Sequence, residues 1–526
     1  MKWLASLWIT AALLLAAGWY ASAQTDTARA AQAVDTVVAP PAPAAGAVEE
    51  AARQAQTPES GVEAQNAPAG PVAAGDVSAA QRARMAAEEA RGGTFAERAV
   101  SLLGLLVFIA MAWAMSVNRG AVPWRTVAWG VGLQIVFAVL IIRTGPGRKL
   151  FDWLNIGFTN LLGYTTEGAR FIFGNLVQPN VPIGPADGPF GAITSPTGWA
   201  NTGAFFAFNV LPTIIFFSSL MTLLYYFGIM QLLVRGVAWV MFRTMGTSGA
   251  ESLSAAGNIF MGQTEAPLLV KPFVKTMTRS ELHSVMTGGF ATVAGGVMAA
   301  YVGMLVAYFP NIAGHLLAAS VMSAPAALAI SKIMYPETEE PVTRGKMRIE
   351  LEKVDANAID AAARGASEGL GLALNVAAML LAFIALLALL NGIIGGIGGW
   401  FGMEWSIQRG LAYLGAPLAW LMGTPWKDAL AVGTLIGEKT ALNEFVAYAH
   451  LAEMLQSGQQ LSARAVVVAT YALCGFANFS SIAIQIGGIG GLAPERRSDL
   501  SRLGLRAMIA GTLASFMTAC VVTMIL

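Results

Sequence analysis

The chain has 526 residues, of which 56% are hydrophobic and 12% charged, and its formal net charge is +1. Soluble domains carry about 25% charged residues, so this composition indicates a protein that lies in a lipid bilayer. The near-zero net charge gives no electrostatic reason to expect a nucleic acid partner. The three histidines match no metal-ligand spacing, and Cys474 and Cys520 lie in apolar runs where they are expected to be core residues.

The N-terminus predicts export. Residues 1–23 contain Lys2, an apolar core that reaches Leu15, and small residues at 21–23, which is the pattern of a secretory signal peptide. An uncleaved first membrane helix is the alternative. Residues 24–96 are rich in Ala, Pro, Gln, Glu and Gly and have almost no aromatic side chains, so we expect a disordered exported tail.

The remainder predicts an all-α integral membrane protein with about eight transmembrane helices. The apolar runs, each near the 20 residues that a spanning helix needs, are 99–117, 126–142, 204–227, 284–308, 313–334, 370–397, 464–486 and 504–526. Stretches 150–177, 231–245 and 405–422 are amphipathic or short, and we expect them to be interfacial helices.

Residues 257–267 place Asn258, Gln263, Thr264 and Glu265 between apolar segments. Successive residues of a helix are about 100° apart, so in an unbroken spanning helix one of these side chains would face lipid. That exposure costs about 2.5–3.5 kcal/mol for a charged group. We therefore expect a helix that is broken at Gly257 and Gly262, with the polar residues on the unwound tip of a re-entrant hairpin.

Residues 437–445 have a similar pattern, with a glycine, a threonine and the carboxylate of Glu444 between apolar segments. Two interrupted hydrophobic segments, one in each half of the chain, are typical of secondary transporters built from repeats. The alternative is that both stretches are ordinary loops.

The distribution of basic residues predicts the orientation. If the N-terminal tail is outside, the residues that fall on the cytoplasmic side are Arg119, Arg125, Arg235, Arg243, Lys271, Lys275, Arg279, Arg344, Lys346, Arg348, Lys353, Arg496, Arg497 and Arg502. Few basic residues fall outside, and Arg143, Arg148 and Lys149 are the exception. The hairpins at 247–278 and 428–455 then enter from opposite faces, which is the inverted repeat of an alternating-access transporter.

Several motifs in this order resemble the concentrative nucleoside transporters, in particular the bacterial sodium-coupled members. They are Gly-Asn-Ile-Phe-Met-Gly-Gln-Thr-Glu-Ala-Pro-Leu at 257–268, Ala-Thr-Val-Ala-Gly-Gly-Val at 291–297, Asn-Gly-Ile-Ile-Gly-Gly-Ile-Gly-Gly-Trp-Phe-Gly at 391–402, Asn-Glu-Phe-Val-Ala-Tyr at 443–448 and Cys-Gly-Phe-Ala-Asn-Phe-Ser-Ser-Ile-Ala at 474–483. The resemblance covers about residues 97–526. It implies an elevator-type homotrimer and says nothing about the signal peptide or the tail. The signal peptide and the distribution of basic residues predict a bacterial inner membrane protein with the tail and the C-terminus on the periplasmic side.

The resemblance also implies the roles of individual residues. Those facing the nucleobase would be Gln263, Thr264, Glu265 and Val297, with Phe476 nearby, and those holding the ribose would be Glu444, Asn478 and Ser481. The sodium ligands would be the side chains of Asn258 and Thr292 and backbone carbonyls around Thr287 and Val293. Sodium would be the coupling ion, and no other cofactor is expected.

The residue types support these roles. Vicinal ribose hydroxyls suit a carboxylate and an amide, and Asn478 and Ser481 are three apart and share a helix face. Interhelical hydrogen bonding is the alternative for this pair.

Two alternative functions remain open. Proton coupling would place the proton on Glu265 or Glu444, although neither Asn258 nor Thr292 could carry one. A membrane-embedded enzyme is a remote alternative, because the spans contain no nucleophile–base pair or acidic cluster.

The expected organisation follows from these elements. Its parts are the signal peptide 1–23, the tail 24–96, scaffold helices 97–236, the first hairpin and transport helices 237–335, a cytoplasmic loop 336–364, a scaffold helix 365–404, and the second hairpin region with the last two transport helices 405–526.

Overall fold

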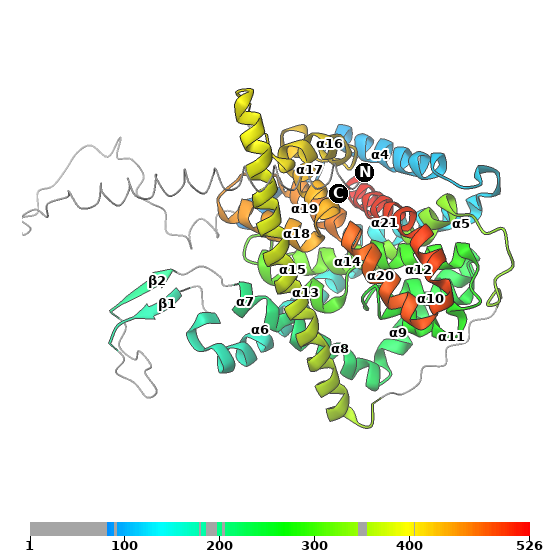
Figure 1. Cartoon of the computed structure of the whole chain (residues 1–526), viewed down its shortest axis with the longest axis horizontal. Coiled ribbons are helices and arrows are strands. Elements are labelled where there is room, and N and C mark those ends of the chain that lie inside the picture. The colour runs from blue at the N-terminus through cyan, green and yellow to red at the C-terminus, as the bar shows by residue number, and fades with distance from the viewer. Residues whose placement is uncertain are drawn as a thin grey trace, which may run out of the picture. The chain divides into compact units, whose positions relative to one another are not determined.

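The computed structural model describes residues 82–88, 92–177, 180–185, 197–201, 206–345, 355–403 and 405–526. All of them belong to one compact unit, Val72–Leu526, shown in colour in Figure 1. The predicted signal peptide and the predicted tail before residue 82 lie outside the described residues.

Helices dominate the described part of the chain, as predicted. Five candidate spans are long and apolar enough to cross a bilayer: α4 (Phe95–Ala114), α5 (Trp124–Arg143), Arg279–Leu305, α14 (Ile312–Met334) and Pro494–Ile525, which contains η5 (Pro494–Arg496) and α21 (Arg497–Ile525). A sixth is possible if α8 (Leu211–Tyr226) and α9 (Ile229–Met245), which meet at 78°, form one bent span. Gly228 forms the bend, with a positive φ of 79°. The expectation of about eight spans stays a prediction.

The candidate spans differ in how deeply they are buried. In Arg279–Leu305 the apolar window is 94% buried, whereas in α4 it is only 28% buried. Large apolar side chains of α4, including Leu102, Leu103 and Leu106, are exposed. The span Arg279–Leu305 therefore lies in the protein core, whereas α4 presents an apolar face that suits a lipid environment.

The first predicted hairpin is interrupted where the sequence indicates. Helix α10 (Gly249–Gly257) begins with a capping box between Ser248 and Glu251 and ends at Gly257, as predicted. A Cβ on Gly257 would lie 2.5 Å from a methyl carbon of Leu269, so the returning chain packs directly on this glycine. The return consists of η4 (Ala266–Val270) and α11 (Lys271–Val274).

The second hairpin has a narrower interruption than expected. Helix α17 (Trp426–Ala441) continues through Gly437, and only Leu442 and Asn443 separate it from α18 (Glu444–Gln456). The break lies within the predicted stretch 437–445 and is confined to these two residues. Two buried charged side chains of this part of α17 have partners: the ammonium of Lys439 donates to the carbonyl of Ala472 at 2.8 Å, and Glu438 pairs with His450 at 2.8 Å.

Each hairpin is followed by a helix that breaks near its middle and then by a long helix. After the first hairpin, α12 (Arg279–Ala291) and α13 (Gly295–Leu305) are separated by residues 292–294 and precede α14. After the second, α19 (Ala463–Leu473) and α20 (Phe479–Leu492) are separated by residues 474–478 and precede α21. The order of elements is thus repeated, and unwound backbone occurs at the corresponding place in each copy.

The remaining elements extend or modify the predictions. They are η1 (Arg119–Ala121), α6 (Gly145–Phe173), η2 (Gly174–Val177), α7 (Phe206–Asn209), α15 (Ala358–Trp400) and α16 (Ile407–Leu421). Helix α15 lies alongside α8 (Figure 1) and begins seven residues before the predicted boundary at 365. A short antiparallel pair, β1 (Asn180–Ile183) and β2 (Gly198–Asn201), was not expected in an all-α chain.

The end of the predicted tail is ordered, contrary to expectation. Residues 82–88 are helical, and Met85 is fully buried. Arg84 donates to the side chain of Gln460 at 3.2 Å and to the carbonyl of Leu461 at 3.0 Å, while Glu88 accepts from the backbone of Ala463 at 2.8 Å. The packed structure therefore begins at least 15 residues before residue 97, because a buried methionine and paired charges compensate for the entropy of ordering this segment.

Candidate functional site

A cavity of about 460 Å³ lies between the tips of the two hairpins. Helix α15 closes it from the side with Leu372, Asn375 and Val376. The eight residues predicted to bind substrate all line this cavity: Gln263, Thr264, Glu265, Val297, Glu444, Phe476, Asn478 and Ser481. The structure therefore brings together residues that are more than 200 positions apart in the sequence, and their roles stay predictions.

Glu444 is the buried carboxylate of the cavity. It is the first residue of α18, and the Asn443 side chain caps this helix by accepting from the backbone of Val446 at 2.9 Å. The Tyr301 hydroxyl donates to Oε1 of Glu444 at 3.1 Å, and Nδ2 of Asn478 donates to Oε2 at 2.9 Å. The carboxylate is thus held in one orientation by a donor on each oxygen and retains lone pairs for further donors.

Asn478 fixes the start of α20. Its Oδ1 accepts from the backbone of Ser481 at 2.9 Å and from the hydroxyl of Ser480 at 2.7 Å. The chain reaches this position through Gly475, whose φ is +128°. A Cβ on Gly475 would lie 2.6 Å from the carbonyl oxygen of Phe290, so both the conformation and the close approach require glycine.

The first hairpin is linked to α20 by a chain of amides. Nε2 of Gln263 donates to the hydroxyl of Ser481 at 3.1 Å, and Nε2 of Gln485 donates both to Oε1 of Gln263 and to the carbonyl of Met286, each at 3.1 Å. Ser481 and Gln485 are one helical turn apart and therefore share a face of α20. Gln263 is consequently oriented from two sides.

Glu265 lies at the tip of the first hairpin and is exposed to the cavity. The backbone N–H of Gly262 donates to its Oε2 at 3.1 Å, which closes the turn. Thr264 packs on α20, because a Cβ on Gly488 would lie 2.8 Å from its methyl carbon. Val297 and Phe476 contribute the apolar part of the wall, so one cavity combines carboxylates, amides and apolar surface.

The four residues predicted to bind sodium are all buried, and Asn258 lies at the end of α10 beside the break between α12 and α13. Nδ2 of Asn258 would lie 3.0 Å from a Cβ on Gly288, so this side chain packs against Gly288 of α12. Thr292 is the first non-helical residue after α12, and its hydroxyl donates to the carbonyl of Gly288 at 2.9 Å.

This neighbourhood fits a small cation. The side-chain oxygen of Asn258 is buried and has no hydrogen-bond partner in the described structure, so an acceptor oxygen is available. The backbone from Thr292 to Ala294 is outside any helix, which frees carbonyl oxygens of the preceding turn. Oxygen donors of this neutral kind suit a hard monovalent ion, whereas the described residues contain no group of three or more His, Cys, Asp or Glu that could hold a metal.

Some residues of the site were not predicted from the sequence. Tyr301 and Gln485 are fully buried and contact predicted residues, yet each lies within a long apolar run. Asn375 also lines the cavity and was not predicted, because it lies in the apolar run of α15. A glutamine or asparagine inside an apolar span is the signal that could have identified Gln485 and Asn375.

A second cavity, of about 380 Å³, adjoins the first. The two share Glu265, Ala294 and Leu372. Its far side contains Arg364, which donates to both carboxylate oxygens of Asp355 at 2.6 and 2.9 Å and to Glu368 at 2.8 Å. The Arg364 guanidinium lowers the pKa of Asp355 below its usual value.

Comparison with known proteins agrees with this geometry. Family models match residues 103–176 (Na⁺ dependent nucleoside transporter N-terminus), 207–308 (Nucleoside recognition) and 315–523 (Na⁺ dependent nucleoside transporter C-terminus). The chain belongs to the Na⁺-dependent nucleoside transporter family. The match includes both hairpins and all twelve predicted site residues.

Relatives of this family occur in bacteria and mammals. An uncharacterized transporter of Haemophilus influenzae is 45% identical over 423 residues, which cover 80% of this chain and 95% of the relative. Solute carrier family 28 member 3 of Mus musculus is 44% identical over 436 residues, covering 80% of this chain and 58% of the relative. The chain thus spans less than two thirds of the mammalian relatives that it matches.

Solved structures of the family show the same fold. CNTnw in an inward-facing substrate-bound state is 43% identical, with a TM-score of 0.72, and the match covers 81% of this chain and 97% of that one. A CNTnw variant in an outward-facing state is 42% identical, with a TM-score of 0.74, 82% of this chain and 98% of that one being covered. The family description and the names of these relatives are those of transporters and not of enzymes.

Proposed function

We propose that the protein imports nucleosides by secondary active transport and that a sodium gradient drives the import. The observation that carries this proposal is the single cavity between the hairpin tips, where the Glu444 carboxylate, the Asn478 amide and the Gln263–Ser481 pair converge. Its volume of about 460 Å³ lies within the roughly 300–1,000 Å³ typical of small-molecule sites.

The arrangement of polar groups favours a sugar at one end and a base at the other. Glu444, Asn478 and Ser481 lie together and offer acceptor and donor atoms to vicinal ribose hydroxyls. At the other end Gln263, Thr264 and Glu265 offer an amide, a hydroxyl and a carboxylate to the edge of a nucleobase. Val297 and Phe476 supply apolar contact with its ring.

Sodium coupling rests on the site beside the first hairpin. Sodium would be held by the side chains of Asn258 and Thr292 and by backbone carbonyls around Thr287 and Val293. Because Asn258 belongs to the same hairpin as Gln263 and Glu265, an ion at this site stabilises the hairpin conformation that binds the solute. That linkage would make ion binding and nucleoside binding mutually favourable.

Alternating access follows from the repeated order of hairpin, broken helix and long helix. We infer that the two hairpins enter a bacterial inner membrane from opposite faces, with the N-terminal tail and the C-terminus on the periplasmic side. The transport helices then move past a scaffold in an elevator-like cycle, and the assembly is a homotrimer.

Uptake of labelled uridine into proteoliposomes tests the proposal. We expect accumulation under an inward sodium gradient and little uptake when choline replaces sodium at constant pH. An inward proton gradient that drives uptake without sodium would instead support proton coupling through Glu265 or Glu444. If labelled uridine is not taken up under either gradient, the proposal that nucleosides are the substrates is contradicted.

A further inference from the structure

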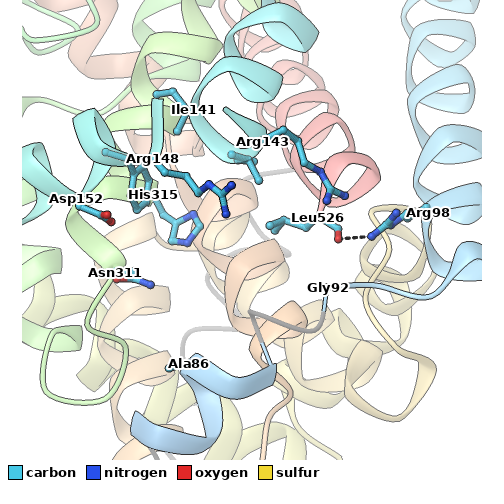
Figure 2. A pocket seen from close by; sticks show the side chains of 12 residues that line it. Ala86, Gly92, Arg98, Ile141, Arg143, Arg148, Asp152, Asn311, His315 and Leu526 are labelled. Carbon is cyan, nitrogen blue, oxygen red and sulfur yellow. Dashed lines mark hydrogen bonds between the residues drawn. The ribbon is translucent and has the colours of Figure 1, made fainter. Parts of the chain in front are cut away.

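A third cavity, with a polar lining, lies at one end of the helix bundle, separate from the proposed substrate site. It has a volume of about 340 Å³, and Figure 2 shows the side chains that line it. Among them are Arg98 near the start of α4, Arg143 at the end of α5, Asn311 just before α14, and Leu526 after α21. All four helices are candidate spans, so the cavity lies where they leave the bilayer.

The cavity has an excess of positive charge. Arg98, Arg143 and Arg148 line it, and Figure 2 shows the three side chains arranged around Leu526. Arg98 donates to a main-chain oxygen of Leu526 and Arg143 to the backbone carbonyl of Ile525, which orients both guanidinium groups. The neutral carbonyl of Ile525 leaves the charge of Arg143 uncompensated. Asp152 and the terminal group of Leu526 offset at most two of the three charges.

The arginines also retain unused donors. The side chain of Arg148 has no hydrogen-bond or ion-pair partner among the described residues, and Nε of Arg98 is buried without an acceptor. The cavity also adjoins the N-terminus of the 29-residue helix α6, where peptide dipoles add positive potential. Unpaired guanidinium groups of this kind suit phosphate oxygens, which arginine binds through two parallel hydrogen bonds.

The walls of the cavity are partly apolar, and lipid-facing side chains surround it. Ile141, Ile142 and Phe151 line the cavity itself. Further along α6, beyond the residues that line the cavity, Trp153 and Ile156 are 69% and 58% exposed. A ligand with a charged head and apolar chains matches both parts.

We propose that this cavity binds the phosphate of an anionic phospholipid, with Arg148 as the principal ligand and with the acyl chains against the exposed face of α6. The proposal also explains Arg143 and Arg148, which are exceptions to the charge distribution of the remaining loops. Arg143 donates to the carbonyl of Ile525 at the end of α21, and Arg148 is available for a headgroup. The site does not depend on the identity of the transported solute.

Native mass spectrometry of the full chain in detergent tests the proposal. Phosphatidylglycerol and phosphatidylcholine with identical acyl chains are added separately, and a third sample contains phosphatidylglycerol with an excess of inorganic phosphate. We expect the protein to retain phosphatidylglycerol at least about fivefold better than phosphatidylcholine, since one arginine near anionic lipid contributes about that factor. Inorganic phosphate is expected not to displace the lipid.

Arg148 and its neighbour Lys149 form a matched pair of variants. Arg148→Gln is expected to lower phosphatidylglycerol retention about fivefold, and Arg148→Lys to lower it less, because it keeps the charge and loses the two parallel bonds. Lys149→Gln removes the same charge from a residue that does not line the cavity, and it should leave retention unchanged.

Three results would overturn the proposal. Equal retention of the two lipids would show that no headgroup site exists, and equal losses in the two glutamine variants would show a general surface attraction. Displacement by inorganic phosphate would show that the cavity takes a free anion instead. Unchanged melting temperatures of the variants verify that each has folded.

Discussion

Glu444 shows how a single side chain is prepared for its role. Its two oxygens each accept one hydrogen bond, from Tyr301 and from Asn478, before any solute is bound. In its proposed role as a ribose ligand, the carboxylate would not have to be reoriented, which reduces the entropic cost of binding.

Glu444→Gln is expected to reduce uridine uptake by at least about tenfold. An amide presents one acceptor in place of two, so either Tyr301 or Asn478 faces a donor, and an unsatisfied buried group costs about 1–3 kcal/mol. Uptake into proteoliposomes measures the effect. Glu453→Gln is the control, because Glu453 is an exposed carboxylate of the same helix. Wild-type uptake by the Glu444 variant would contradict the ribose assignment.

Asn258→Ala is expected to raise the sodium concentration for half-maximal uptake several-fold, because it removes an oxygen that has no other partner. Thr292→Ser keeps the hydroxyl that donates to Gly288 and should leave the sodium dependence close to that of the wild type. Uptake is measured as a function of sodium at constant ionic strength. An unchanged sodium dependence in the Asn258 variant would exclude this residue as a ligand.

At the residue scale the sequence predicted the polar tips better than the partners behind them. Gln263 and Glu265 were identified because polar groups are costly in an apolar segment. Tyr301 was not, because a tyrosine in an apolar run has no such cost and its bond to Glu444 joins residues 143 positions apart. Lys439 was noticed only as part of a motif, and its partner, the carbonyl of Ala472, could not be predicted from local sequence.

At the scale of elements, the breaks inside helices decide where the site forms. Gly475→Ala is expected to lower the free energy of unfolding by about 1–3 kcal/mol, because alanine at φ +128° is strained and its Cβ would overlap the Phe290 carbonyl. Gly487→Ala, in the interior of α20 with no atom within 4 Å of the added carbon, should be neutral or slightly stabilising. Melting temperatures in detergent compare the two, and equal values would contradict the strain argument.

Elements were predictable where a local rule governs them. The end of α10 at Gly257 follows from the cost of polar groups in lipid. This argument uses only the helical periodicity of the local sequence and needs no information on tertiary contacts. The continuation of α17 through Gly437 and the bend of 78° between α8 and α9 depend on packing partners that are distant in sequence. The strand pair β1–β2 also arises from contacts across a connection that gives no periodic signal.

At the scale of the whole molecule, the predicted tail divides at residue 82, where the described structure begins. A variant without residues 25–80 is expected to transport uridine like the wild type, because that stretch has no sequence signal for folding. Extending the deletion to residue 91 removes the contacts of Arg84, Met85 and Glu88 and should lower the melting temperature by a few degrees. Both variants keep residues 1–24. Lower uptake by the first variant, correctly inserted, would show that the stretch has a function.

Glu265 belongs to the walls of both the 460 Å³ and the 380 Å³ cavities. If Glu265 binds the nucleobase as proposed, a solute that leaves the first cavity through the second has to break its contact with this carboxylate. Glu265 would then contribute both to binding and to release of the solute. A substitution at this position that raised the affinity for the solute would also slow its release and lower the turnover rate.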